Sequence, residues 1–486
     1  MNKSNYWLIP FFVCGLFYYP LIANNLMYMD DTFRAISGYD GWASLGRPFA
    51  DFVMHRVMLK SAYLIGYAQL GQLISVAIMA LTSIFIANNV FTIDGWFKYV
   101  LCCGFALNPF FLENMSYQYD SLPMAISLCL PVVAAIIIWR KELYNILIAV
   151  ALLIIATGLY QTSVNTYVGF FAATVLIKTA SNQHSPKDII ISCVKGISAI
   201  LLSTIAYMMI IKLFIPMTSD RGSLVDMGPG YIDYFLKLSN RAYGLLANTL
   251  SYRFSVISLI FIALVSVFGI MKGSNKTLRT ILVLIAAFVV YFSMVGIVSL
   301  IRDQFVASRI LMGASAITFL FFALAGLQFV PKWASISASV IIILPLFLAS
   351  YSYGFASKYQ REYDSVNVNS AINDIRRDQS YDQKSYISFS GRMPFSPVVS
   401  HTIKKYDLIA LIVMPSYDWT ASMMAQSWGV SGVRFNFSRG EQKETIALVC
   451  GKNAPKISEN DSYAIYRNVN KNGYLVWMKG VKKNPC

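Results

Sequence analysis

Residues 252–271 read YRFSVISLIFIALVSVFGIM, with Arg253 as the one charged side chain in the stretch. An α-helix of about 20 residues crosses the hydrocarbon core of a bilayer, so this stretch predicts a transmembrane helix. Comparable apolar stretches recur from Tyr6 to Tyr353, and a soluble protein has no reason to repeat bilayer-length segments so often. We therefore expect an α-helical polytopic membrane protein.

The composition supports this fold class. The 486 residues are 56% hydrophobic and 13% charged, whereas soluble domains average about 45–50% and about 25%. The formal net charge of +16 is compatible with a nucleic-acid partner. However, much of this charge lies in short turns between apolar stretches, where the positive-inside rule accounts for it. We expect no nucleic-acid partner.

The apolar stretches predict about eleven transmembrane helices. They are centred on residues 7–23, 62–86, 97–112, 122–139, 143–159, 162–178, 189–215, 252–271, 279–300, 306–330 and 334–354. With the amino terminus inside, every inside turn carries Lys or Arg, whereas the short outside turns at 113–121 and 160–162 carry neither. An odd number of spans then places the carboxyl-terminal tail outside.

Two domains follow from this layout. Residues 1–357 form the membrane domain, with outside loops at 24–61, 113–121 and 216–250, and residues 358–486 form a small outside α/β domain. In this tail we expect one helix and four β-rich runs. The helix covers Val366 to Arg377, and the β-rich runs are Tyr406 to Met414, Thr445 to Cys450, Tyr463 to Tyr466 and Tyr474 to Trp477.

The tail carries 18 Lys and Arg and 11 Asp and Glu. Such a surplus suits either anionic membrane lipids or a solvated basic surface, and the sequence leaves both open. Cys450 and Cys486 lie in this polar tail and could form a disulfide if the tail faces an oxidising compartment. The cysteines show no metal-ligand spacing, and no nucleotide-binding motif is present, so we expect no cofactor.

The first outside loop contains the most informative motif, YMDDTFR at residues 28–34. Asp30 and Asp31 lie just beyond the first span, where repulsion between adjacent carboxylates favours proton retention by one of them and hence a role as a base. Arg34 is close enough to pair with Asp31 or to face a phosphate. Trp42 and Arg47 follow in the glycine-containing runs GYDGW and GRP. A charge cluster that merely ends the helix is the alternative interpretation.

The second outside turn, NPFFLENMSYQYD at residues 108–120, is acidic and aromatic. Aromatic rings stack on the apolar faces of sugars, while carboxylates and amides bond to sugar hydroxyls. Glu113, Tyr117, Gln118 and Asp120 are therefore candidate sugar-binding residues. An aromatic belt at the membrane interface accounts for the tyrosines equally well.

Arg302 and Arg309 lie where the ninth span ends and the tenth begins, seven residues apart on one helical face. An arginine at this depth is costly unless it is paired or faces a polar cavity, and its planar fork matches a phosphate. The alternative is an arginine that extends to the interface or pairs with Asp303.

With these motifs, the chain resembles the serotype-converting O-antigen glucosyltransferases encoded by temperate phages of enteric bacteria. These GtrII-like proteins belong to the GT-C class of membrane glycosyltransferases. The resemblance covers the whole length. It depends on Asp30-Asp31 with Arg34, on the Gly41-Trp42 and Gly46-Arg47-Pro48 runs, on the 108–120 turn, and on the many-span layout with an outside tail.

The resemblance implies the reaction. The donor would be undecaprenyl-phosphate-glucose, and the acceptor a sugar of the lipid-linked O-antigen of lipopolysaccharide, so that the product changes the serotype. The enzyme would lie in the bacterial inner membrane, with a cytoplasmic amino terminus and a periplasmic carboxyl terminus. Asp30 or Asp31 would deprotonate the acceptor hydroxyl, which attacks the glucose with inversion.

The remaining roles follow from that reaction. Arg309, Arg302 and Arg34, in falling order of preference, would stabilise the departing phosphate. The resemblance leaves a metal requirement open, and the Asp pair lacks further identifiable oxygen ligands. A lipid-linked oligosaccharide flippase or other transporter is the principal alternative function, and a noncatalytic assembly or ligase-like factor is the third. The acceptor hydroxyl and the oligomeric state cannot be predicted from the sequence.

Overall fold

The computed structural model describes residues 3–57, 59, 63–215, 225, 228, 230–300, 307–434, 440–451, 453–470 and 472–486. Within it the chain divides into two compact units. Unit 1 comprises Met1–Asn25, Asp40–Tyr351 and Tyr406–Leu408, and unit 2 comprises Leu26–Tyr39, Ser352–Lys405 and Ile409–Cys486. The segment that carries the Asp30-Asp31 motif thus belongs to the same unit as most of the tail.

Unit 1 is helical throughout its described residues. Its elements are η1 Lys3–Leu8, α1 Ile9–Asn24, η2 Ala43–Leu45, α3 Pro48–Phe52, η3 Val53–Val57, α4 Leu70–Asn89, α5 Phe97–Leu101, η4 Cys102–Phe105, α6 Phe111–Ser116, α7 Ser121–Ile137, α8 Tyr144–Leu159, α9 Ser163–Ala180, α10 Pro186–Phe214, α11 Tyr231–Leu250, α12 Tyr252–Lys272, α13 Lys276–Ser293, η5 Gly296–Leu300, η6 Ser308–Ile310 and α14 Ala314–Ala325. The helix α15, Lys332–Arg377, begins in unit 1 and ends in unit 2.

Six helices in the described residues are long and apolar enough to cross a membrane. They are Asn5–Asn24, Leu70–Asn89, Pro186–Phe214, Tyr252–Lys272, Lys276–Ser293 and Lys332–Arg377, and three shorter apolar helices accompany them, α7, α8 and α14. The chain is therefore a mostly helical membrane protein. The count of about eleven spans and the side on which each terminus lies stay predictions.

The third predicted span, residues 97–112, is not one helix. α5 ends at Leu101, η4 continues to Phe105, and α6 begins only at Phe111. Pro109 explains part of this interruption, because a proline disfavours helical backbone at the residue before it. The break leaves α6 as a separate short helix, which carries Glu113.

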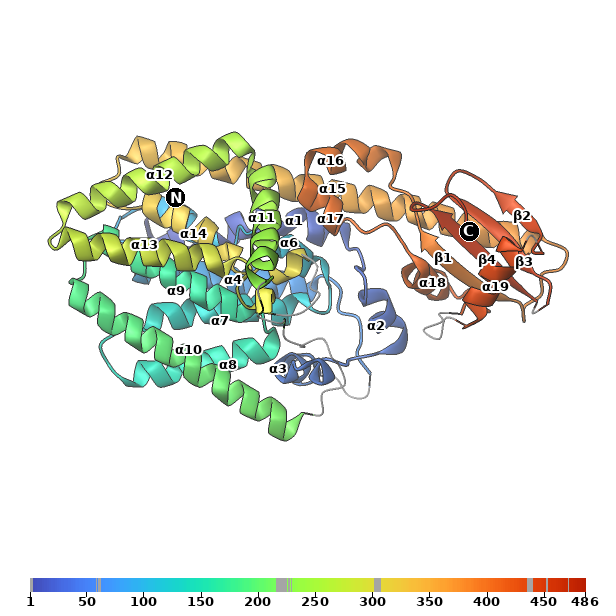
Figure 1. Ribbon diagram of the computed structural model, residues 1–486, viewed down its shortest axis with the longest axis horizontal. Coiled ribbons are helices and arrows are strands. Elements are labelled where there is room, and N and C mark those ends of the chain that lie inside the picture. The colour runs from blue at the N-terminus through green and yellow to red at the C-terminus, as the bar shows by residue number, and fades with distance from the viewer. Residues whose placement is uncertain are drawn as a thin grey trace. The chain divides into compact units, whose positions relative to one another are not determined.

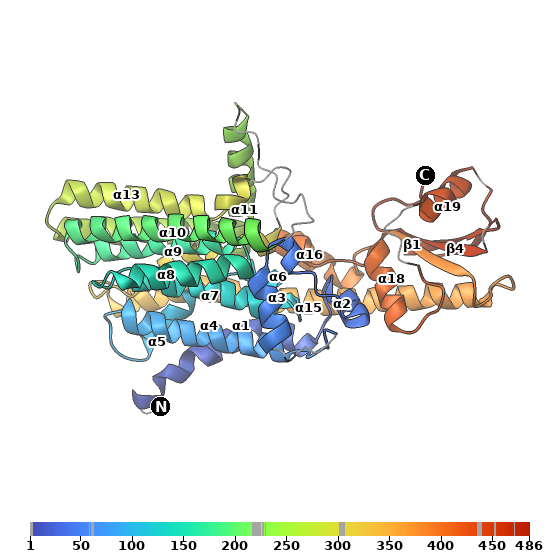
Figure 2. The same ribbon diagram turned by 90° about the horizontal axis from the view of Figure 1, so that it is seen from below.

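The helices of unit 1 pack around α9. In both views the long helices α7 to α10 and α13 lie side by side (Figures 1 and 2), and α9 contacts α7, α13 and α14. Gly169 of α9 permits the close approach, because a Cβ there would collide with Ser293 of α13 and Ala316 of α14. Small residues at helix contacts are typical of membrane bundles, where packing replaces the hydrophobic effect as the driving force.

Unit 2 is a four-stranded sheet flanked by helices. Besides the end of α15, its elements are α2 Asp31–Ser37, β1 Tyr386–Arg392, η7 Pro397–Val399, α16 Ser400–Lys405, most of α17 Asp407–Ile412, α18 Asp418–Ser427, α19 Gly440–Cys450, β2 Lys456–Glu459, β3 Tyr463–Asn468 and β4 Gly473–Lys479. The strand order is β1-β4-β3-β2. β1 pairs with β4 in parallel, and the other pairs are antiparallel.

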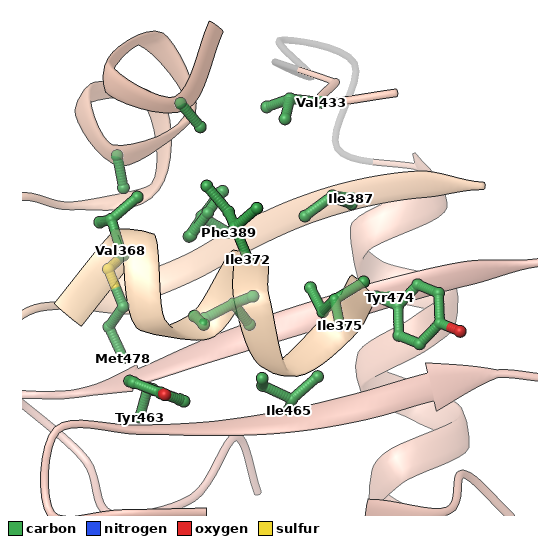
Figure 3. Close-up of a cluster of buried hydrophobic side chains, with 14 of the residues drawn as sticks. Val368, Ile372, Ile375, Ile387, Phe389, Val433, Tyr463, Ile465, Tyr474 and Met478 are labelled. Carbon is green, nitrogen blue, oxygen red and sulfur yellow. The ribbon is translucent and has the colours of Figure 1, made fainter. Parts of the chain in front are cut away.

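The core of unit 2 lies between α15 and one face of this sheet. Val368, Ile372 and Ile375 project from α15 at helical spacing toward Ile387 of β1 and Ile465 of β3 (Figure 3). A smaller cluster on the other face brings the alternate strand residues Ala464, Tyr466 and Trp477 against Ile446 and Val449 of α19. The sheet is thus buried on both faces, which identifies the tail as an α/β layer structure.

The structure corrects part of the predicted tail. The helix Val366–Arg377 is confirmed as the end of α15, and the runs 463–466 and 474–477 are confirmed as parts of β3 and β4. Two predicted strands are wrong, because residues 407–412 form α17 and residues 440–450 form α19. Cys450, the last residue of α19, forms a disulfide with Cys486 across a sequence separation of 36 residues.

Candidate functional site

Arg309 is held in place by α6. Its backbone N–H donates to the carboxylate Oε2 of Glu113 at 2.8 Å, and its carbonyl accepts from Asn114 Nδ2 at 3.2 Å. The neighbouring Ser308 donates its hydroxyl to the carbonyl of Phe110 at 2.8 Å. Three hydrogen bonds to this short helix and the residue before it therefore fix the backbone around Arg309, so that little conformational entropy remains to be lost when its side chain binds a ligand.

The side chain of Arg309 is held as well. Its Nη1 donates to the hydroxyl of Tyr117, and its Cζ lies 5.7 Å from the centre of the Tyr117 ring. The Oδ1 of Asn114, next to Glu113, is buried and has no hydrogen-bond partner among the described residues. The structure thus brings Arg309 together with Glu113 and Tyr117 of the 108–120 turn, although the sequence predicted the two motifs separately.

Glu113 is a buried carboxylate. Only 8% of its surface is exposed. Burial raises the pKa of Glu113, while the charge of Arg309 and the backbone N–H groups of Ser308 and Arg309 lower it. These contacts make Glu113 the residue that positions Arg309.

Trp42 and Asp120 form a second pair. The indole Nε1 of Trp42 donates to the carboxylate of Asp120, which immediately precedes α7. Trp42 is fully buried and Asp120 is 5% exposed. Trp42 packs with Tyr119 and Leu159, so its ring is enclosed by protein while its N–H orients the carboxylate. Gln118, two residues before Asp120, donates to Asn25 Oδ1 at 2.8 Å.

Arg47 is positioned by a tight turn. Gly46 adopts φ 75°, a left-handed conformation that favours glycine. Its carbonyl accepts from Tyr207 Oη at 2.7 Å and from Gln161 Nε2 at 3.1 Å. This turn directs the Cζ of Arg47 to 4.5 Å from the centre of the Tyr160 ring.

Tyr160, in the turn between α8 and α9, connects these groups. Its hydroxyl is buried, which raises its pKa. The charges of Arg47 and Arg309 lower that pKa, and the charges of Glu113 and Asp120 raise it. Four charged residues, from the turn at Arg47, the 108–120 turn and the segment at Arg309, therefore lie within electrostatic range of one tyrosine hydroxyl. We call Arg47, Glu113, Tyr117, Asp120, Tyr160 and Arg309 the unit 1 cluster.

Sequence reasoning missed Tyr160 and Gln161. It treated residues 160–162 only as an outside turn without Lys or Arg. The signal was the composition of that turn, Tyr-Gln-Thr, which is too polar for a simple connection between two apolar helices. Arg302 was also predicted for the site, but it lies outside the described residues.

Asp30, Asp31 and Arg34 belong to unit 2. Asp31 is fully buried at the start of α2, and its Oδ2 accepts from the backbone N–H of Tyr28 at 3.0 Å. Arg34 is 4% exposed and donates through Nη1 to the carbonyl of Tyr39 at 3.2 Å. Asp30 precedes α2 and is only partly buried. The two adjacent aspartates therefore differ in access to solvent, with Asp30 the more accessible.

The described residues contain no group of three His, Cys, Asp or Glu side chains that could hold a metal ion. The unit 1 cluster instead combines two guanidinium groups with two carboxylates and two tyrosines. Such an arrangement can bind a phosphate through the arginines and sugar hydroxyls through the carboxylates.

Comparisons with known proteins place the chain in a family. The family described as Glucosyl transferase GtrII matches residues 19–320, which is more than half of the chain and includes every residue of the unit 1 cluster. The chain is 24% identical over 448 residues to an uncharacterized 55.3 kDa protein in the gtrB 5′ region of Salmonella phage P22, with 85% of this chain and 88% of that protein covered. No solved structure matches. The chain therefore belongs to the GtrII glucosyl transferase family.

Proposed function

We propose that the protein transfers glucose from undecaprenyl-phosphate-glucose to a sugar of the lipid-linked O-antigen, at the periplasmic face of the inner membrane and with inversion at the anomeric carbon. The observation that carries the proposal is the gathering of Arg47 and Arg309 around the buried Tyr160. Two positioned arginines suit a phosphate leaving group, and the description of the family indicates that the transferred sugar is glucose.

The donor phosphate would bind to Arg309 and Arg47. Guanidinium forks match phosphate oxygens, and arginines fixed before the reaction stabilise the charge that develops as the glycosidic bond breaks. The unpartnered Oδ1 of Asn114 is an acceptor for a glucose hydroxyl. Arg302 stays a candidate for the same phosphate, whereas Arg34 is assigned to holding the segment that carries Asp30.

An apolar groove supports a lipid donor. It has a volume of about 320 Å³ and lies between α9, α10 and α13, where Tyr167, Cys193 and Ala286 are among the residues that line it. Tyr167 lies in the second turn of α9, which begins at Ser163, three residues after Tyr160. A prenyl chain in this groove would lie deeper in the bilayer than a phosphate bound near Tyr160.

Asp30 is the proposed base. It is the more accessible carboxylate of the pair, while Asp31 accepts from Tyr28 and shapes the loop. The carboxylate of Asp30 would take the proton of the acceptor hydroxyl as that oxygen bonds to the glucose C1. The bond from C1 to the phosphate oxygen breaks, and its electron pair leaves with the lipid phosphate.

The other predicted residues receive supporting roles. Glu113 positions Arg309, Tyr117 orients the guanidinium, and Trp42 orients Asp120, whose carboxylate would bond to a sugar hydroxyl. Gln118 secures the end of α1 through Asn25. The periplasmic location is supported by the Cys450–Cys486 disulfide, since disulfides persist in oxidising compartments.

The test uses purified full-length protein in detergent with labelled undecaprenyl-phosphate-glucose and lipid-linked O-antigen. We expect Asp30→Asn to lower the transfer rate by about 10²–10⁴-fold, the usual contribution of a general base. We expect Asp31→Asn to have a smaller effect and the exposed Arg377→Gln to have none.

Wild-type rates in Asp30→Asn would remove Asp30 from the reaction. If the wild-type protein forms no glycosidic product in detergent, where no membrane separates two compartments, the transporter alternative would be favoured over catalysis.

A further inference from the structure

Unit 2 contains a pocket of its own, whose walls combine apolar residues with Ser357, Arg361 and Asp364. Its walls are the segment 26–32, residues 357–364 of α15 and the segment 413–420, all of which belong to unit 2. Its volume is about 50 Å³. One water molecule needs about 10–15 Å³ on such a measure, so the pocket has room for a few waters or for one tetrahedral anion.

Arg361 lines this pocket and is incompletely compensated. It lies beyond the apolar part of α15, which ends near Tyr353. Desolvation lowers the pKa of Arg361, and the nearby Asp364 raises it. Arg361 nevertheless forms no ion pair within 4.0 Å with any residue that the structure describes. A partly buried guanidinium without an ion pair gains from an added anion.

Asp364 carries the opposing negative charge in the pocket wall, but its oxygens accept hydrogen bonds from groups other than Arg361. Oδ1 accepts from Gln360 Nε2 at 2.8 Å, and Oδ2 accepts from the backbone N–H of Ser416 at 2.7 Å. Asp364 is 1% exposed. Burial raises the pKa of Asp364 to about 6, so that its negative charge is held at a cost.

A second arginine adds positive charge beside the pocket. Desolvation lowers the pKa of Arg392 at the end of β1, while Asp364, Tyr417 and Tyr28, all of them wall residues, raise it. The Nε of Arg392 is buried without a hydrogen-bond partner in the described part of the chain. Two guanidinium groups thus lie within electrostatic range of one carboxylate.

Ser357 supplies an unused donor. Its hydroxyl is buried, has no hydrogen-bond partner within the described ranges, and lies in the pocket wall one helical turn before Arg361. An unsatisfied buried hydroxyl costs about 1–3 kcal/mol, which a bound acceptor oxygen would recover. Charge, volume and free donors therefore point to the same kind of occupant.

We propose that this pocket binds a phosphate group, with Arg361 and Ser357 as direct ligands and Arg392 as a second cation. Its source is either a lipid head group, including that of a lipid-linked acceptor, or a free phosphate, and both present the same oxygens. Tyr28, Met29 and Thr32 of the pocket wall flank Asp30 and Asp31. Occupancy would therefore order the segment that carries the proposed base, a consequence that depends on the proposed function.

The test measures binding rather than transfer, in full-length protein that carries Arg309→Gln so that the unit 1 cluster contributes less. Inorganic phosphate is titrated into the protein in detergent by calorimetry, and nanodiscs of phosphatidylglycerol are compared with nanodiscs of phosphatidylcholine by thermal unfolding. The variants are Arg361→Gln, Arg361→Lys and Ser357→Ala, with the exposed Arg377→Gln as a matched control on the same helix.

We expect Arg361→Gln to weaken phosphate binding at least tenfold, Arg361→Lys to weaken it less, and Arg377→Gln to leave it unchanged. Stabilisation that depends on Arg361 and occurs only in phosphatidylglycerol identifies a lipid head group, whereas binding in detergent identifies a free phosphate. Binding that is equal in the Arg309→Gln parent and in both Arg361 variants, or absent in both settings, overturns the proposal. We expect Asp30→Asn to bind phosphate normally. A variant that loses transfer but keeps phosphate binding therefore bears on the proposed function and not on this pocket.

Discussion

Arg309 of unit 1 and Arg361 of unit 2 each have a carboxylate nearby, but they differ in how their neighbours hold them. Arg309 is fixed at its backbone by Glu113 and Asn114 and at its guanidinium by Tyr117. Arg361 has a carboxylate nearby, Asp364, but that carboxylate is bonded to Gln360 and Ser416 instead.

The difference indicates two uses of an arginine. A guanidinium whose position is fixed beforehand is suited to a charge that exists only in the transition state, because it needs no reorganisation at that moment. A guanidinium that is desolvated and incompletely paired is suited to a charge that is already present on a bound group. We therefore expect Arg309 to govern the rate and Arg361 to govern binding.

The largest expected effect separates these two roles. Arg309→Gln should lower kcat by about 10²–10³-fold, the usual cost of removing a donor that stabilises developing charge. If the phosphate that Arg361 binds is that of the lipid-linked acceptor, Arg361→Gln should instead raise KM for this acceptor about tenfold and leave kcat nearly unchanged, as expected for an interaction made equally in ground and transition states. Steady-state kinetics with each substrate varied would measure both, and the comparison fails if the two variants share one pattern.

The second expected effect concerns stability and is confined to unit 2. Cys450→Ser should lower the free energy of unfolding of unit 2 by about 2–4 kcal/mol, because the closed loop of 36 residues no longer restricts the unfolded chain. Hydrogen exchange followed by mass spectrometry should show faster exchange in α19 and β4 and unchanged exchange in α9. Cys193→Ser in unit 1 is the control. Faster exchange in both units would show that the units do not unfold independently.

The same two units differ in how well the sequence predicts them. The long helices of unit 1 were predictable because apolar stretches of bilayer length, such as 252–271, are rare outside membrane-spanning segments. The tail was harder, since short apolar runs suit strands and helices alike. Residues 445–450 were predicted as a strand, although Ile446 and Val449, three positions apart, have the spacing of a helix face against the sheet. β1 was not predicted, because its partner β4 lies more than eighty residues away.

The candidate site divides in a similar way. The polar turns at 28–34 and 108–120 stood out because charges beside apolar spans are rare, and Glu113, Tyr117 and Asp120 do lie in one cluster. The convergence of Arg47, Arg309 and Tyr160 could not be predicted, because it depends on three helix ends that tertiary packing brings together. The functional roles of Asp30 and Asp31 stay predictions.

The smallest expected effect is the pH dependence that Asp364 gives to the stability of unit 2. Its pKa lies at about 6 in the folded protein against an ordinary value of 3.8. Folding therefore favours the protonated form of Asp364. The stabilisation that the folded protein gains by holding this proton is complete below pH 4 and is lost as the pH rises toward 6. Over that window wild-type unit 2 should lose about 2–3 kcal/mol relative to Asp364→Asn.

Unfolding of both proteins at pH 4, 5, 6 and 7 would measure this loss, with the exposed Asp461→Asn as the control. If the stability of the wild type and of Asp364→Asn changed with pH in parallel, burial would not raise the pKa of Asp364.

Sulfate binding provides a second test, because the charge of sulfate is constant over this range. If Arg361 and Arg392 hold an anion, protonation of Asp364 removes the only opposing charge in the described wall. Sulfate affinity should then rise several-fold from pH 7 to pH 5 in the wild type and stay level in Asp364→Asn.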